Sequence, residues 1–354
     1  MRSLVRSAAV ITAGLLMVPA LAAPSSAAKP ASLSGSWLAR QLATGVVHNN
    51  QFGVDDYGLT ADTALALKSV GGHRKALRKT RKALAANVDS WVSPGSDVYA
   101  GSVAKAAVVA KALGGKPKSF GGVNLVKQLS ATVTPSGRNK GRIRDTSSFG
   151  DYANTIGQAY AARALSTAHS PKARSVVRFL LAQQCAKGYF RLNFAAPTAA
   201  SQKCDPSDRA GSPADPDATA LAVLNLSTIK HPSAKVRTSL KKATRWLKRQ
   251  QRKNGSFIGG PTTATPNANS TGLAGTALGA VGACKQARKA ATWVKRLQVG
   301  AKAGGALAHE HGAIAYDRAA LSAARSTGIT STSQDQWRRA TAQAAPALRF
   351  LDGC

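Results

Sequence analysis

Acidic residues are scarce in this chain of 354 residues. Lys and Arg number 49 against 15 Asp and Glu, a formal charge of +34, and Glu310 is the only glutamate. This excludes a cytosolic enzyme of balanced charge, and Glu–Lys pairs along helices do not offset the basic residues. Because 44% of the residues are apolar, the chain can still bury a substantial core, so the charge alone does not indicate disorder.

Long apolar runs are equally scarce. One lies near the start, over 8–18, after Arg2 and Arg6 and before a run of small residues. This order is typical of a secretory signal peptide, and the run is too short to span a bilayer core of about 30 Å. We expect a signal peptide over 1–22, with cleavage after residue 22 or residue 28.

The chain beyond the signal peptide should be secreted. Without Arg2 and Arg6 it carries 47 basic and 15 acidic residues, or +32, and has no transmembrane anchor. The Pro- and Ser-rich segment 23–36 is expected to be a flexible leader. A single folded domain is expected over 37–354.

Only four cysteines and six histidines are present. In an exported chain the cysteines fit two disulfides. Cys185 and Cys204 bracket a segment rich in turn residues and are paired first, and Cys284 with Cys354 follows by elimination. The sequence His309-Glu310-His311 lacks the spacing of a zinc-binding HExxH helix, so no zinc ligand set is visible.

A repeated segment indicates the architecture. Its fullest copy, over 242–257, is Lys-Ala-x-x-Trp-Leu, then Gln251, then Gly255-Ser-Phe. A second copy, over 179–190, places Gln184 and Gly188 at the same spacing. A third, over 289–298, ends at Gln298, but Lys302 stands where glycine is expected. Each copy predicts an amphipathic helix that ends near a glycine.

Between these copies lie helices of small, apolar residues, which are typical of buried, closely packed positions. Their starts recur every 40 to 63 residues, the period of a helix pair with loops. Six alternations predict an all-α toroid, (α/α)6, with six inner and six outer helices over 37–354. The expected inner helices are 62–67, 102–113, 154–165, 217–226, 270–278 and 317–324.

The segment 242–257 resembles the repeat of the squalene-cyclase and prenyltransferase superfamily, whose members share the α/α toroid. The resemblance is strongest over 154–324. It implies the fold but leaves the activity open, because that superfamily includes lipid cyclases, protein prenyltransferases, thioester proteins and cobalamin carriers. The thioester motif is absent, since Lys285-Gln286 follows Cys284.

Asp215-Pro-Asp217-Ala-Thr-Ala is similar to the Asp-x-Asp-Asp-Thr-Ala motif of class II triterpene cyclases, which implies that Asp217 would be the proton donor. Ala218 replaces one acid of that motif. Those cyclases bury their site between two barrels, whereas this chain has length for one. Asp, Asn and Ser recur at the expected starts of inner helices, so an N-cap role for Asp217 is the competing interpretation.

Two other segments hold candidate binding residues. The loop 205–217 clusters acids, and Asp205, Asp208 and Asp215 have the oxygen ligands that calcium requires, although turn residues look the same. Calcium is the only cofactor considered. The segment 145–154 combines acids, hydroxyls and aromatics at the mouth of the toroid. The candidate ligand-binding residues are Asp145, Phe149, Asp151, Tyr152, Asn154, Asp215, Asp217 and Tyr316.

Basic runs over 74–82, 138–144, 235–253 and 285–296 fall largely on expected outer helices. Either they are solvated faces, or they attract anionic polymers of the cell envelope. Specific nucleic-acid binding is not expected.

The sequence favours a secreted, envelope-associated toroid that binds a small or lipid-like ligand at its mouth without catalysis. The alternatives are a terpenoid cyclase or mutase that uses Asp217, and a polysaccharide-acting toroid for which Tyr152, Asn154 and Arg163 form the one compact set.

Overall fold

The computed structural model describes residues 29–205, 207 and 210–354, and the expected signal peptide lies outside them. Helices form nearly all of the regular structure. Two short strands, β1 (His48–Asn49) and β2 (Val54–Asp55), pair in an antiparallel hairpin. Within the described ranges, none of the helices is long and apolar enough to cross a membrane.

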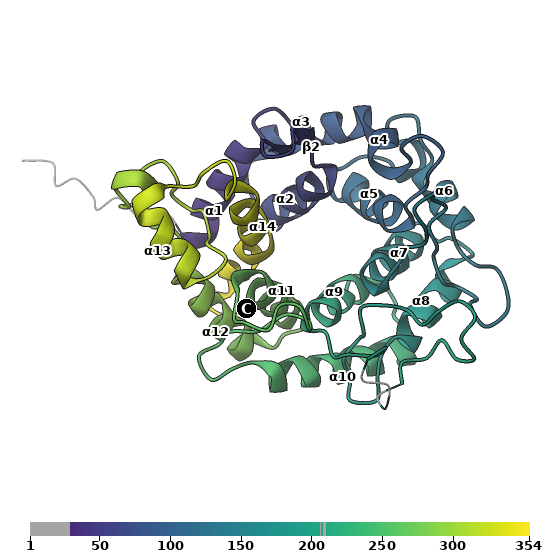
Figure 1. Ribbon diagram of the computed structural model, residues 1–354. Coiled ribbons are helices and arrows are strands. Elements are labelled where there is room, and N and C mark those ends of the chain that lie inside the picture. Colours follow the sequence, from purple (N-terminus) through teal and green to yellow (C-terminus); the bar gives the residue numbers. More distant parts are fainter. Residues whose placement is uncertain (1–28, 206, 208–209) are drawn as a thin grey trace, which may run out of the picture.

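Six helices form a closed inner ring (Figure 1). Each helix packs on the next in chain order, and the last packs on the first. The expected all-α toroid is therefore confirmed. The inner helices are α2 (Tyr57–Val70), α5 (Ala100–Ala112), α7 (Thr155–Thr167), α9 (Pro216–Leu226), α11 (Ala268–Ala280) and α14 (Gln334–Ala344).

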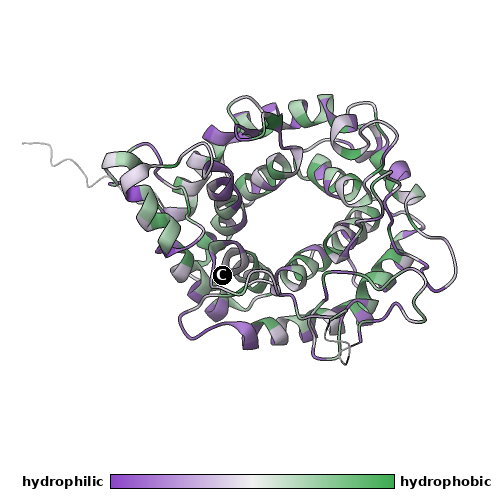
Figure 2. Cartoon of the chain, in the orientation of Figure 1, coloured by the Kyte–Doolittle hydropathy of each residue, from purple (hydrophilic) through white to green (hydrophobic). Residues whose placement is uncertain are grey.

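Most outer helices bury one apolar stripe and expose basic residues, as the sequence predicts for the runs in α3, α10 and α12. In Figure 2 the outer helices show both hydrophilic and hydrophobic stretches. The outer helices are α1 (Pro30–Gln41), α3 (Arg74–Ala86), α6 (Leu125–Ala131), α8 (Ala173–Ala182), α10 (Ala234–Gln250) and α12 (Cys284–Lys295). Shorter or additional helices are α4 (Val88–Val92), α13 (Arg318–Thr327) and the 3-10 helices η1 (Pro117–Ser119), η2 (Gly305–Leu307) and η3 (Ala345–Phe350).

The sixth inner helix differs from the expected one. Residues 317–324 fall on α13, which buries only Ala324 and packs on η2 outside the ring. The ring is closed by α14, which packs against α2 and α11. Its buried Arg338 donates hydrogen bonds to the side chain of Gln41 and the carbonyl of His48. Because these polar contacts satisfy the guanidinium, the last inner helix does not need the small apolar composition of the others.

The expected leader over 23–36 also needs correction. Helix α1 begins at Pro30, whose fixed φ suits the first turn of a helix. The hydroxyl of Ser34 is buried and donates a hydrogen bond to the carbonyl of Gly312. The toroid therefore starts with an outer helix and ends with an inner one, and its two ends pack together.

The repeated glutamine connects the loops after α8, α10 and α12 to the next outer helix. The side-chain amide of Gln251 donates to the carbonyls of Gly255 and of Gln286 in α12, at 3.1 and 2.9 Å. Gln184 makes the same pair of bonds to Gly188 and to Ser239 in α10. Gln298 donates to the carbonyl of Pro30 and the hydroxyl of Ser34, and so connects the last of these loops to α1.

The repeated glycine is required by close backbone contact. Gly255 has φ of +96°, and a Cβ there would collide with the carbonyl of Lys289. The glycine that seemed absent from the third copy is Gly312, with φ of +94° against the carbonyl of Leu33. It lies 14 residues after Gln298, whereas Gly255 lies four residues after Gln251, so an insertion hides it in the sequence.

Both expected disulfides are present. Cys185 pairs with Cys204 and Cys284 with Cys354, at Cα–Cα distances of 5.0 and 5.3 Å, within the usual range for a disulfide. For the second pair, η3 packs against α12 and returns the C-terminus to the start of that helix.

The glutamine connection predicts a matched pair of variants. Replacing Gln251 by Ala removes two hydrogen bonds and leaves two carbonyls without them, so the free energy of unfolding should fall by roughly 1–3 kcal/mol. Replacing the exposed neighbour Gln250 by Ala should change it by less than about 0.5 kcal/mol. Urea denaturation of the two variants measures the difference, and equal effects would show that the connection is not stabilising.

Candidate functional site

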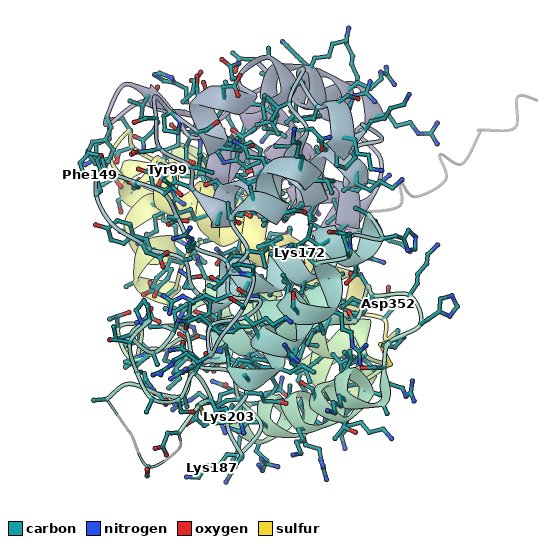
Figure 3. All side chains as sticks on the ribbon, turned by 90° about the vertical axis from the view of Figure 1, so that its right-hand side faces the viewer. Tyr99, Phe149, Lys172, Lys187, Lys203 and Asp352 are labelled. Carbon is teal, nitrogen blue, oxygen red and sulfur yellow. A yellow bond between two sulfur atoms is a disulfide. The ribbon has the colours of Figure 1, made fainter. Side chains whose placement is uncertain are left out.

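The inner helices begin at one end of the toroid, which we call the mouth. Figure 3 shows Tyr99, next to the start of α5, and Phe149 at this end, with Asp352 at the opposite end. Asn154 caps α7, as the sequence predicts. The caps of α2, α9 and α11 are Asp56, Asp215 and Asn267. The expected cap positions Asp62, Ser102, Asp217 and Ser270 lie inside their helices instead.

Each inner helix carries a row of residues, at helical spacing, that are less buried than their neighbours. Because outer helices cover the opposite side, these rows face the axis of the toroid, and we call them together the axial face. The axial face is formed chiefly by Gly58, Asp62, Leu65, Gly101, Lys105, Ile156, Tyr160, Arg163, Asp217, Leu221, Leu224, Asn269, Leu273, Thr276, Arg339 and Gln343.

Asp217 lies in the first turn of α9, one turn inside the mouth. Its Oδ2 accepts a hydrogen bond of 3.1 Å from the hydroxyl of Ser270 on α11, and its Oδ1 has no partner among the described residues. Burial raises the pKa of Asp217 to about 7, with a further increase from the charge of Asp215 and a partial offset from Ser270. A carboxyl group with this pKa still holds a proton near neutral pH.

Asp215 has a structural role beside Asp217. It is 4% exposed and its Oδ1 accepts the backbone N–H of Ala218, which caps α9. Burial raises the pKa of Asp215, while hydrogen bonds from the N–H groups of Ala218 and Asp217 act in the opposite direction. Because Asp215 is the N-cap of α9, the carboxyl of Asp217 is not used for capping and is available to a ligand.

The surroundings of Asp217 are largely apolar on the axial face. Leu221 and Leu224 follow it on α9, and Leu273 lies on α11. Tyr316 stands close enough that the charges of Asp317 and Asp217 raise the pKa of its phenol, after the larger effect of burial.

The opposite part of the axial face is charged. Lys105 on α5 pairs with Asp62 on α2 at 3.0 Å, and its Nζ lies 5.7 Å from the ring centre of Tyr160 on α7. Burial opposes the charge of Lys105, but the combined effects of Asp62, Tyr160 and Asp56 outweigh it, and the net effect raises the pKa of the lysine. Lys105 was not among the sequence candidates; its signal is a charge inside an otherwise alanine- and valine-rich helix.

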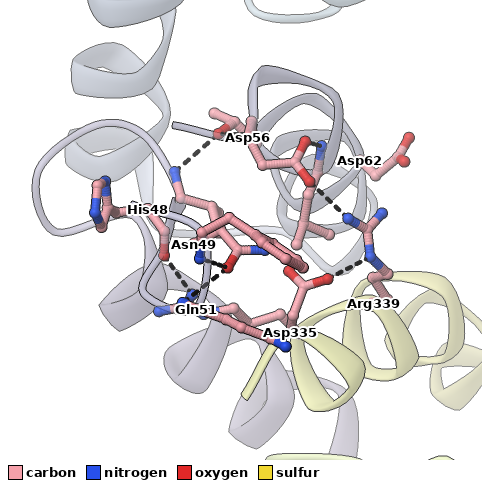
Figure 4. Close-up of polar contacts among 12 residues, drawn as sticks. His48, Asn49, Gln51, Asp56, Asp62, Asp335 and Arg339 are labelled. Atoms are coloured by element: carbon pink, nitrogen blue, oxygen red, sulfur yellow. Dashed lines mark hydrogen bonds and ion pairs between the residues drawn. The ribbon is translucent and has the colours of Figure 1, made fainter. Parts of the chain in front are cut away.

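A pocket of about 380 Å³ opens at the mouth between the β1–β2 hairpin, α2, α4 and α14. Arg339 on α14 bonds both Asp56 and Asp335, at 2.6 and 2.7 Å (Figure 4). The pair with Asp56, the N-cap of α2, joins the first and last inner helices, whereas Asp335 lies on α14 itself. The pocket is lined mainly by Asn49, Phe52, Asp56, Tyr57, Trp91 and Arg339.

In the predicted binding segment 145–154, the two acidic side chains already bond other groups of the protein. Asp145 accepts the backbone N–H groups of Ala100 and Tyr152, and Asp151 pairs with Arg142 at 3.1 Å. Both acids line a separate pocket of about 820 Å³. Phe149 and Tyr152 are 73% and 67% exposed.

The proposed Tyr152, Asn154 and Arg163 set is not compact. Asn154 caps α7, and Arg163 lies on the same helix about 13 Å further from the mouth at 1.5 Å per residue.

The calcium prediction stays open. Asp208 lies outside the described residues. Asp205 accepts hydrogen bonds from Ser207, and Asp215 caps α9. In the ranges that the structure covers, no group of three or more candidate ligands is found together.

No protein-family model matches the sequence, and a search of curated proteins finds no match. Solved structures nevertheless share the α/α toroid class. A crystal structure of a protein from Actinoplanes is 18% identical, with a TM-score of 0.60, and the alignment covers 91% of this chain and 98% of that one.

Two other similar structures have known activities. The type II terpene cyclase MstE from Scytonema is 14% identical, with a TM-score of 0.59 and coverage of 90% and 96%. An unsaturated glucuronyl hydrolase from a Bacillus species is 11% identical, with a TM-score of 0.58 and coverage of 92% and 97%. At these identities the likeness shows the fold alone, and it confirms the expected α/α toroid.

The raised pKa of Asp217 predicts a pH-dependent stability. The folded state binds the proton more tightly than the unfolded chain, whose aspartate titrates near 3.8. The free energy of unfolding of the native chain, relative to that of Asp217→Asn, should therefore fall by about 2–4 kcal/mol as pH rises from 4 to 8. Denaturant titrations at each pH measure this difference. The exposed Asp89→Asn serves as control, and a parallel trend for both variants would contradict the assignment.

Proposed function

We propose that this toroid is an enzyme that uses Asp217 as a general acid to protonate an isoprenoid alkene bound along its axial face. The observation that carries the proposal is the carboxyl of Asp217, which is largely buried, faces the axis and retains a proton near neutral pH. General acids need a pKa near the working pH and a substrate within reach.

Two features, the N-cap of α9 and the single toroid, are compatible with catalysis by Asp217. The cap of α9 is Asp215, so N-capping does not account for Asp217. A single toroid is also sufficient for a cyclase, because this one toroid covers 96% of the solved MstE chain. These points favour the catalytic alternative over binding without catalysis.

The neighbours of the acid suit an apolar acceptor. Leu221, Leu224 and Leu273 line the axial face next to it, so the part of the substrate near the proton should be hydrocarbon. The proton moves from the carboxyl oxygen to an alkene carbon and leaves a carboxylate on Asp217. The hydroxyl of Ser270 already donates to Oδ2, and it stabilises that carboxylate as it forms. The new carbocation can then be attacked by a second double bond of the same chain.

Turnover of isoprenoids tests the proposal. The protein without residues 1–28 is incubated with squalene, geranylgeraniol and farnesol, and products are identified by gas chromatography and mass spectrometry. Conversion should be lost by at least about 100-fold in Asp217→Asn and be retained in Asp89→Asn. The rate should fall as pH rises above about 7, because the acid then loses its proton.

Three results would overturn the proposal. Binding of these isoprenoids without conversion would favour a toroid that binds a ligand without catalysis. Conversion that survives Asp217→Asn would move the chemistry elsewhere. Conversion of an oligosaccharide but of no isoprenoid would favour the polysaccharide-acting alternative.

A further inference from the structure

Three cations lie on the axial face: Lys105, Arg163 and Arg339. Lys105 is paired with Asp62, and Arg339 with Asp56 and Asp335. Arg163 differs from both. Within the described part of the chain, its guanidinium has neither a carboxylate within 4.0 Å nor a hydrogen bond.

An unpaired guanidinium inside a protein is costly. Burial lowers the pKa of Arg163, and the nearby phenol of Tyr160 only partly offsets this. Arginine presents five donors in a fixed plane that match a carboxylate or phosphate, and a partly buried guanidinium makes a stronger pair with such an anion than one in bulk water does. Arg163 is only partly buried and its guanidinium nitrogens are open to the axial space, so they are available to an anionic ligand.

The position of Arg163 relative to Asp217 defines the length of such a ligand. Asp217 is the second residue of α9 and Arg163 the ninth of α7, and the two helices are neighbours in the ring that begin at the same end. At 1.5 Å per residue, the Cα of Arg163 lies about 10 Å deeper along its helix than the Cα of Asp217 does along α9.

We propose that Arg163 binds the anionic head group, a carboxylate or a phosphate, of an amphiphilic isoprenoid whose hydrocarbon chain extends toward Asp217. The proposal rests on the proposed function for the identity of the chain, and it adds an orientation. The head enters first and lies deep beside Tyr160, and the apolar part lies along Leu221 and Leu273 below the acid. The pairs at Lys105 and Arg339 leave Arg163 as the cation available to a ligand.

The test compares ligands that differ only in the head group. Binding of farnesoate, farnesyl phosphate and farnesol is measured by isothermal titration calorimetry in about 0.15 M salt, which screens the general positive field of the protein. The unmodified chain should bind at least one of the two anions at least about tenfold more tightly than farnesol, and the two anionic arms distinguish a carboxylate head from a phosphate head.

Arg163→Gln should remove that preference and leave the affinity for farnesol unchanged. Arg325→Gln removes the same charge from the exposed face of α13 and should behave like the unmodified chain. Arg163→Lys should keep part of the preference. A preference that survives Arg163→Gln, an equal loss in Arg325→Gln, an equal loss for farnesol, or no binding of any of the three would overturn the proposal.

The anion site at Arg163 and the acid function of Asp217 can fail independently of each other. If farnesol is still converted through Asp217 while Arg163→Gln has no effect on head-group preference, the acid function stands and the orientation fails. If head-group preference depends on Arg163 but no isoprenoid is converted, the anion site stands and the enzymatic function fails.

Discussion

The contact on which the second half of the toroid depends is a glutamine side chain that donates two hydrogen bonds. Gln184, Gln251 and Gln298 each connect a loop to the following outer helix. The same loops then donate a backbone N–H to a threonine hydroxyl of the next inner helix: Phe190 to Thr219, Phe257 to Thr271 and Ile314 to Thr341. Outer and inner helices are thereby held in register, and this register brings Ser270 of α11 to the carboxyl of Asp217 on α9.

The parts of the fold that could be predicted are those that repeat locally. Glutamine, glycine and an aromatic at fixed spacing predict the helix, its end and the loop contact. The sequence did not predict α14 as the sixth inner helix, because the hydrogen-bond partners of its buried Arg338, Gln41 and His48, lie almost 300 positions earlier. One signal was available: Thr341 occupies the threonine position that Thr219 and Thr271 occupy in α9 and α11. Gly312 was likewise hidden by the insertion after Gln298.

The site was predictable only where one segment contains it. The motif around Asp217 is local, but its role depended on which acid caps the helix. Pro216 decides this, because proline favours the first helical position and makes Asp215 the cap. The pairs Asp62–Lys105 and Asp56–Arg339 join different helices, so only the closed ring reveals which cations are neutralised and which one, Arg163, is not. In the loop 145–154, by contrast, the sequence predicts that the acids bind a ligand, but their carboxylates accept hydrogen bonds from backbone N–H groups.

The excess of positive charge has little effect on the acid. Burial has the largest effect on the pKa of Asp217 and raises it, and the smaller effects come from Ser270 and Asp215 and not from a cation. Many of the basic residues lie on outer helices, where solvent and salt screen them beyond about 8 Å at physiological ionic strength. The outer charge raises the concentration of anions near the molecule, whereas the unpaired Arg163 is the group that can select one inside it. The two roles need different residues, because only a partly buried cation can contribute energy that salt does not remove.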